Sequence, residues 1–135
     1  MPSLPLIQDV VIELLKTAFP DALIDSWVPN VDFRTFPLIN VRRIGGARHG
    51  THPNKLGLPV VELTVYGNVG VDETHELYEA VLDVLYDAVQ KQTQTAHGYL
   101  HSIKETMGAT QFDSPMTDTW RVQGLIQFGL RPLRN

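Results

Sequence analysis

Two histidines three residues apart, His49 and His52, are the first residues in this sequence whose types and spacing suggest chemistry. Imidazole nitrogens bind zinc, but a catalytic zinc site normally takes three protein ligands that are held by further hydrogen bonds. Gly50 and Pro53 disfavour the helical turn that would bring both rings to one metal ion. The sequence therefore predicts no metal site and no other cofactor.

Other motifs that carry catalytic chemistry are weak or missing. The stretch "GGARHG", residues 45–50, is rich in glycine but lacks the GK[ST] ending of a phosphate-binding loop. No G-x-S-x-G or H-E-x-x-H motif occurs, and the absence of cysteine excludes thiol catalysis and thiolate metal sites. Asp113 and Asp118 flank a Ser-Pro-Met turn, which explains these two carboxylates more simply than acid–base catalysis does. We therefore predict that the protein is not an enzyme.

Basic residues surround the two histidines and make this part of the chain locally cationic. The segment from residue 42 to 55 contains Arg42, Arg43, Arg48, His49, His52 and Lys55. Such a segment is either a solvated, mobile loop or a surface that orders against an acidic neighbour. Fixing the backbone of some 14 residues costs on the order of 14–28 kcal/mol of conformational free energy. Burying the apolar part of a standard interface contributes about 20 kcal/mol, before the costs of association are subtracted. We therefore expect ordering only where several subunits surround the segment.

Sequence typical of β-strands lies on both sides of this basic segment. The runs "PLINVRRIGG", residues 37–46, and "PVVELTVYG", residues 59–67, contain clustered branched apolar residues and are closed by Gly and Pro. Between the two strands we predict a long flexible loop at about residues 45–58, whereas most hairpin loops have only about 2–5 residues. A loop of this length indicates either a function or disorder.

Two segments have the periodicity of amphipathic helices. Residues 5–18 repeat apolar side chains at helical spacing, with Ser3 as the expected cap and Pro5 in the first turn. The second helix is expected to be capped by Asp72 or Thr74 and to extend to about residue 91. Its acidic residues lie mostly away from the apolar stripe, and such a surface is usually only solvated. Three of them form a candidate face for a basic neighbour: Glu76, Glu79 and Asp83.

The remaining segments complete a predicted sheet. A short strand is expected within residues 22–28, followed by an irregular stretch at 30–36. Residues 98–112 are typical of a strand with a bulge at Gly108, and residues 119–133 alternate apolar and polar side chains. The polar face of the last strand indicates a sheet with one open face. We therefore predict the α+β class, with an antiparallel β-sheet and two amphipathic helices packed on one face.

Length and charge limit the domain organisation and the partners. The chain has 135 residues and a net charge of −4, which predicts a single domain over residues 1–135. The acidic balance and the lack of a basic recognition helix weigh against a DNA-binding module. The N-terminus lacks the basic start of a signal peptide, and no apolar run approaches the length of a membrane span. We therefore expect no membrane partner.

The order of these elements resembles that of the tail terminator proteins of long non-contractile-tailed phages, including those of actinobacterial phages. The matching features are "LIQDVVIELLKTAFP", "FPLINVRRIGG" with the glycine-rich loop, "PVVELTVYG", "DETHELYEAVLDVLYDAV", the "DSP" turn and "TWRVQGLIQFGLRP". Together they cover nearly the whole chain. The resemblance lies in order and composition, and no single motif is diagnostic.

This resemblance implies a structural virion protein that caps the head-proximal end of the tail tube as a hexameric ring. It would end tube polymerisation and provide the surface to which the head joins. The implied partners are copies of itself, the tail tube protein and head-completion or neck proteins, with DNA only passing through the lumen. The implied location is the head-proximal end of the tail in the virion, and the host cytoplasm during assembly.

The residues and the resemblance together suggest where subunits meet. We expect residues 42–58 to reach a ring neighbour or the tube, with their basic side chains meeting carboxylates such as those of the second helix. Two alternatives stay open. One is a head-completion or neck protein, and the other is a small-molecule-binding α+β domain, although the sequence shows no convergent polar pocket.

Overall fold

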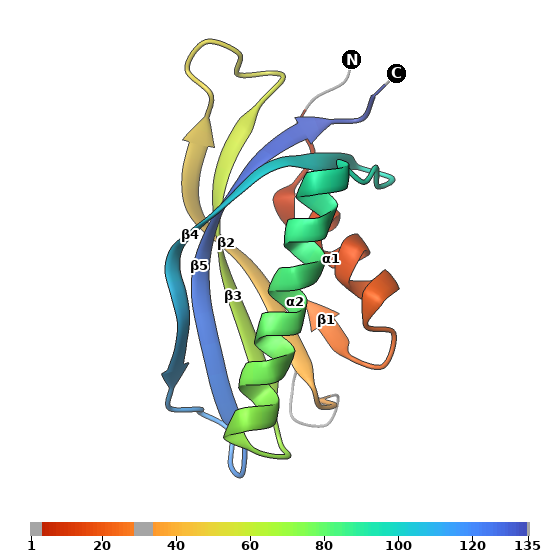
Figure 1. Cartoon of the computed structure of the whole chain (residues 1–135). Coiled ribbons are helices and arrows are strands. Elements are labelled where there is room, and N and C mark those ends of the chain that lie inside the picture. Colours follow the sequence, from red (N-terminus) through yellow and green to blue (C-terminus); the bar gives the residue numbers. More distant parts are fainter. Residues whose placement is uncertain (1–3, 29–33, 135) are drawn as a thin grey trace.

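The computed structural model describes residues 4–28 and 34–134, which form a five-stranded sheet and two helices (Figure 1). The elements are α1 (Ile7–Ala18), β1 (Leu23–Asp25), β2 (Leu38–Arg48), β3 (Gly57–Gly67), α2 (Val71–Lys91), β4 (Gly98–Phe112) and β5 (Trp120–Pro132). Across the sheet the strand order is β1-β2-β3-β5-β4. Both helices cover the same face of the sheet (Figure 1), which confirms the predicted α+β class.

Strand pairing is antiparallel between β2 and β3, between β3 and β5, and between β4 and β5. The exception among the described strands is β1, which pairs with β2 in parallel from Leu23 opposite Leu38 to Asp25 opposite Asn40. Parallel neighbours need a crossover connection, and the chain between Asp25 and Leu38 is long enough to supply one. The predicted irregular stretch at 30–36 belongs to this connection, and only its residues 34–36 lie within the described part of the chain.

Both predicted helix caps were misplaced. Helix α1 begins at Ile7, and Ser3 lies outside the described residues. Helix α2 is capped by the backbone of Gly70, while Asp72 and Thr74 lie inside its first turn. The Thr74 hydroxyl donates a hydrogen bond to the Gly70 carbonyl at 2.7 Å. A carboxylate in the first turn stabilises a helix through its dipole, so Asp72 contributes to the start of the helix without being its cap.

The loop between β2 and β3 is shorter than predicted. Strand β2 continues to Arg48 and β3 begins at Gly57, so the connection covers residues 49–56 and not 45–58. The strand has a bulge between Arg43 and Gly45, and Gly46 has a positive φ of 87°. These two features allow β2 to remain paired with β3 beyond its two glycines. The resulting hairpin projects beyond the rest of the sheet (Figure 1).

The core lies between the two helices and the inner face of the sheet. Val61, Leu63 and Val65 on β3 point inward as predicted, and each is at most 1% exposed. Helix α2 contributes Tyr78, which is fully buried and was not part of the predicted apolar stripe. Its hydroxyl points at Gly124 of β5. Glycine fits at this position because it has no side chain that would obstruct the tyrosine ring. Burying one large apolar side chain stabilises the fold by about 1.5–3 kcal/mol.

Candidate assembly surfaces

The tip of the β2–β3 hairpin, residues 49–56, has its own network of hydrogen bonds. The backbone N–H of His49 donates to the Leu56 carbonyl at 2.9 Å. The Nδ1 atom of the same histidine accepts the backbone N–H groups of Thr51 and His52, both at 3.1 Å. The two imidazole rings stack with their centroids 5.4 Å apart. These contacts offset part of the conformational entropy cost that we expected for ordering a flexible loop.

Hydrogen bonds from two arginines, one on β2 and one on β5, hold this tip in place. The Arg48 guanidinium donates to the Pro53 carbonyl at 3.4 Å and to Asn54 Oδ1 at 3.2 Å. Arg131, at the end of β5, donates to the Lys55 carbonyl at 3.5 Å and ties the tip to the sheet. The hairpin therefore brings four of the six predicted basic residues together at one exposed end: Arg48, Lys55 and the two histidines.

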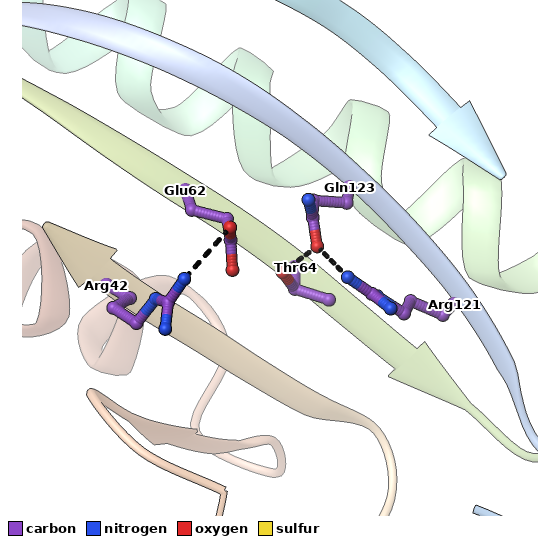
Figure 2. Close-up of polar contacts among 5 residues, drawn as sticks. All are labelled: Arg42, Glu62, Thr64, Arg121 and Gln123. Atoms are coloured by element: carbon purple, nitrogen blue, oxygen red, sulfur yellow. Dashed lines mark hydrogen bonds and ion pairs between the residues drawn. The ribbon is translucent and has the colours of Figure 1, made fainter. Parts of the chain in front are cut away.

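The other two predicted cations, Arg42 and Arg43, lie away from the tip. Arg42 is on the outer face of the sheet and forms an ion pair of 3.3 Å with Glu62 (Figure 2). Arg43 folds back onto the bulge, where it donates to the Gly45 carbonyl at 3.1 Å and to the Gly46 carbonyl at 3.3 Å. Strand pairing thus divides what the sequence suggested was one basic segment.

The outer face of the sheet carries an ordered polar cluster that the sequence did not reveal. Thr64 donates to Gln123 Oε1 at 3.1 Å, and Arg121 donates to the same oxygen (Figure 2). Thr64 and Gln123 are only 2% and 7% exposed, and the hydrogen bond between them joins the neighbouring strands β3 and β5. Alternation in the sequence indicated the direction of these side chains. Their burial depends on cross-strand partners far away in the sequence, so no local pattern signalled it.

The three predicted carboxylates of α2 lie together on its exposed side. They line a shallow groove of about 410 Å³, whose lining is Asp72, His75, Glu76, Glu79, Ala80 and Asp83. His75 Nε2 lies 3.3 Å from Glu79 Oε1. Between Asp72 and Asp87 the helix carries no lysine or arginine. The surface therefore presents a negative charge of the kind that a basic partner would recognise.

A further acidic contact joins α2 to the edge strand β4. The Tyr86 hydroxyl donates to Glu105 Oε2 at 2.8 Å, and this hydrogen bond, followed by burial, raises the pKa of Tyr86. The pKa of Tyr78 is raised mainly by burial, and then by the nearby carboxylates of Glu105 and Glu79. Glu79 and Glu105 thus both lie near Tyr78. Sequence reasoning missed Glu105 because its place beside α2 depends on tertiary packing.

The two predicted halves of the contact do not meet within one chain. Within residues 4–28 and 34–134, no hydrogen bond or ion pair joins the hairpin tip to α2. In the same described ranges, no group of three or more histidines or carboxylates is placed to hold a metal ion. Neither of the two described helices is long and apolar enough to span a membrane. A contact between the basic tip and the acidic face of α2 therefore requires a second molecule.

Known proteins are similar to this chain in sequence or in fold. Residues 3–135 match the model of a family described as phage tail termination protein. The Gene 22 protein of Mycobacterium phage D29 is 51% identical over 137 residues, covering 100% of this chain and 99% of the relative. The Gene 22 protein of Mycobacterium phage L5 is 53% identical over 133 residues, covering 97% and 96%. A solved structure described as the virion of a native gene transfer agent (GTA) particle contains a chain with a TM-score of 0.64 and 16% identity, covering 93% of this chain and 94% of that one.

Proposed function

Because the chain belongs to the phage tail termination protein family, we propose that it caps the head-proximal end of the tail tube as a hexameric ring. In this role it ends tube polymerisation and provides the surface to which the head joins. Members of the family are structural proteins of the phage tail, and this chain is one of them. The observation that carries the proposal is the family match over residues 3–135, supported by 51% and 53% identity to two mycobacteriophage proteins of nearly the same length.

The geometry supports a ring because each subunit has two different, oppositely charged surfaces. The basic hairpin tip and the acidic face of α2 belong to different parts of the chain and do not contact each other. Contacts between unlike surfaces of identical subunits run head to tail, and they close into a ring when the rotation between neighbours permits. The same surfaces can meet the tail tube protein below the ring and neck proteins above it, while DNA passes through the lumen.

The hairpin tip is the proposed contact with a ring neighbour or with the tube. Arg48 and Lys55 are exposed, and the tip contains no carboxylate. Charged groups across an interface steer association and fix its register. Three carboxylates of α2 are the proposed acceptors on a neighbouring subunit: Glu76, Glu79 and Asp83.

Reversing the charge of the tip should block tail assembly. In a phage that carries Arg48→Glu together with Lys55→Glu, we expect the yield of infectious particles to fall by about 10- to 100-fold, because the reversed charges would repel the carboxylates across the interface. Lys55→Glu alone should show part of the loss, and it leaves the hydrogen bonds of Arg48 in place. Lys16→Glu, which makes the same charge change as Lys55→Glu on α1, should have no effect. Normal yields from the double variant would contradict the role of the tip.

The proposed function is tested by electron microscopy of lysates from a phage in which this gene carries an early stop codon. Over-long tails of variable length without heads are expected for a terminator. Headless tails of normal length would instead assign the protein to head joining, and intact particles would exclude both roles. Supplying the intact chain in trans should restore normal tails in the first case.

A further inference from the structure

Both edges of the sheet are open over much of their length. The strand order leaves the outer edge of β4 unpaired among the described strands, and β1 covers β2 only from Leu38 to Asn40. From Arg42 to Arg48, β2 is exposed at every position. An open edge is a ready surface for contact with another chain.

Irregular pairing at these two edges determines what kind of contact they can make. The bulge between Arg43 and Gly45 interrupts β2, and the register of β4 shifts between Leu100 and Ser102 and again between Glu105 and Met107. Bulges of this kind disfavour a continuous backbone ladder with a foreign strand. A contact between these edges must therefore depend on side chains.

The side chains at the two edges have opposite charges on the same side of the sheet. Arg43 and Arg48 lie opposite Val61 and Gly57 in the β2–β3 pairing, and Val61 belongs to the core. Because positions alternate along a strand, both arginines are on the side of the sheet that faces the helices. Within residues 4–28 and 34–134, their guanidiniums bind backbone carbonyls and the Asn54 side-chain oxygen, and no carboxylate in these ranges pairs with either arginine.

On the other edge, carboxylates occupy the helix side. Glu105 of β4 accepts the hydrogen bond of Tyr86, and both Glu105 and Glu79 lie close enough to Tyr78 to raise its pKa. Tyr86 is 41% exposed, and at the bulge of β2 the apolar side chain of Ile44 is 42% exposed. Each edge thus offers charge of one sign beside an exposed large side chain, a composition suited to an interface.

We infer that the helix side of the β2 edge in one copy of this chain contacts the β4–α2 flank of the next copy. Arg43 and Arg48 then meet Glu105 and Glu79, and Ile44 lies near Tyr86. Charge complementarity between two surfaces of the same chain identifies a second copy as the partner. The inference rests on the proposed function, because it names the surfaces through which neighbouring subunits of the ring join.

A charge-swap series tests this contact. Each variant is supplied in trans to the phage whose own gene carries the early stop codon. Glu105→Lys and Arg43→Glu should each lower the yield of infectious particles at least about tenfold, and the two together should restore it to within about threefold of the wild type. Asp21→Lys has the same charge change as Glu105→Lys at an exposed site in the turn between α1 and β1, outside the proposed contact, and should have no effect. A wild-type yield of infectious particles from Glu105→Lys, or no recovery of the yield in the combined variant, would contradict the inferred contact.

Cross-linking gives an independent measurement that does not depend on how well Arg43→Glu folds. The chain has no cysteine, so Ile44→Cys on β2 and Gln90→Cys on α2, an exposed position one helical turn after Tyr86, can be introduced into separate chains that are supplied together. In purified particles, a short bismaleimide reagent should link an Ile44→Cys chain to a Gln90→Cys chain, and particles made with either variant alone should give no dimer. Particles that assemble normally without the mixed dimer would overturn the inference while leaving the proposed function intact. Normal particles from the stop-codon phage itself would overturn the proposed function instead.

Discussion

Replacing Gly46 with alanine is expected to open the end of the β2–β3 hairpin and to abolish tail termination. Gly46 has a φ of 87°, and an added Cβ would lie 2.2 Å from the Leu58 carbonyl oxygen and 2.7 Å from both Pro59 Cα and Val60 N. All three atoms belong to the backbone and cannot move aside without breaking the pairing. The left-handed conformation alone costs about 1–2 kcal/mol, and we expect a local loss of more than about 3 kcal/mol in total.

Gly45→Ala is the matched control for this substitution. Gly45 has no heavy atom within 4 Å of the position of an added Cβ, and its φ is not positive. Hydrogen exchange of the amides of residues 45–48 and of Gly57, Leu58 and Val60 should accelerate in Gly46→Ala and remain unchanged in Gly45→Ala. Equal protection in both variants would show that the bulge does not depend on glycine.

Replacing Gly124 with alanine is expected to destabilise the whole fold. The new Cβ would lie 1.9 Å from the Tyr78 hydroxyl oxygen and 2.9 Å from the Met107 carbonyl oxygen. Tyr78 is fully buried, so its ring can move only by disturbing the core. Overpacking of this kind costs roughly 1–3 kcal/mol, and the fully buried Tyr78 ring together with the Met107 backbone carbonyl favours the upper part of that range. Denaturant unfolding should show a lower midpoint with an unchanged slope.

Tyr78→Phe should rescue Gly124→Ala. The Tyr78 hydroxyl has no hydrogen-bond partner within the described part of the chain, so removing it alone should change the free energy of unfolding by less than about 1 kcal/mol. In the combined variant the nearest ring atom would be Tyr78 Cζ, at 3.0 Å from the new Cβ. We therefore expect the double variant to regain about half or more of the loss. Additive effects of the two substitutions would contradict this account of the core.

Periodicity in the sequence was sufficient to predict both helices and the main strands, because their apolar faces are determined locally. Val61, Leu63 and Val65 alternate inward as expected. The loop bounds were wrong because glycine within a strand pattern often weakens or interrupts the strand, whereas here a bulge at Ile44 and the positive φ of Gly46 let β2 continue. The parallel position of β1 depends on a crossover connection that leaves no periodic signal.

The candidate contacts were predictable only as far as they depend on neighbouring residues in the chain. Helical spacing brought Glu76, Glu79 and Asp83 to one surface as expected. The division of the basic segment between the hairpin tip and the bulge follows from strand register, which the sequence did not specify. The bond between Tyr86 and Glu105 joins two elements through tertiary packing and was missed for that reason.

The central claim, that this chain forms a ring on the tail tube next to the head, is tested most directly by cryo-electron microscopy of the tail at its head-proximal end. We predict a ring of six copies on the last tube layer, with the hairpin of each subunit, residues 49–56, contacting a neighbouring subunit or the tube. Absence of this chain from that position, or its presence only at the portal or at the distal tip, would contradict the account.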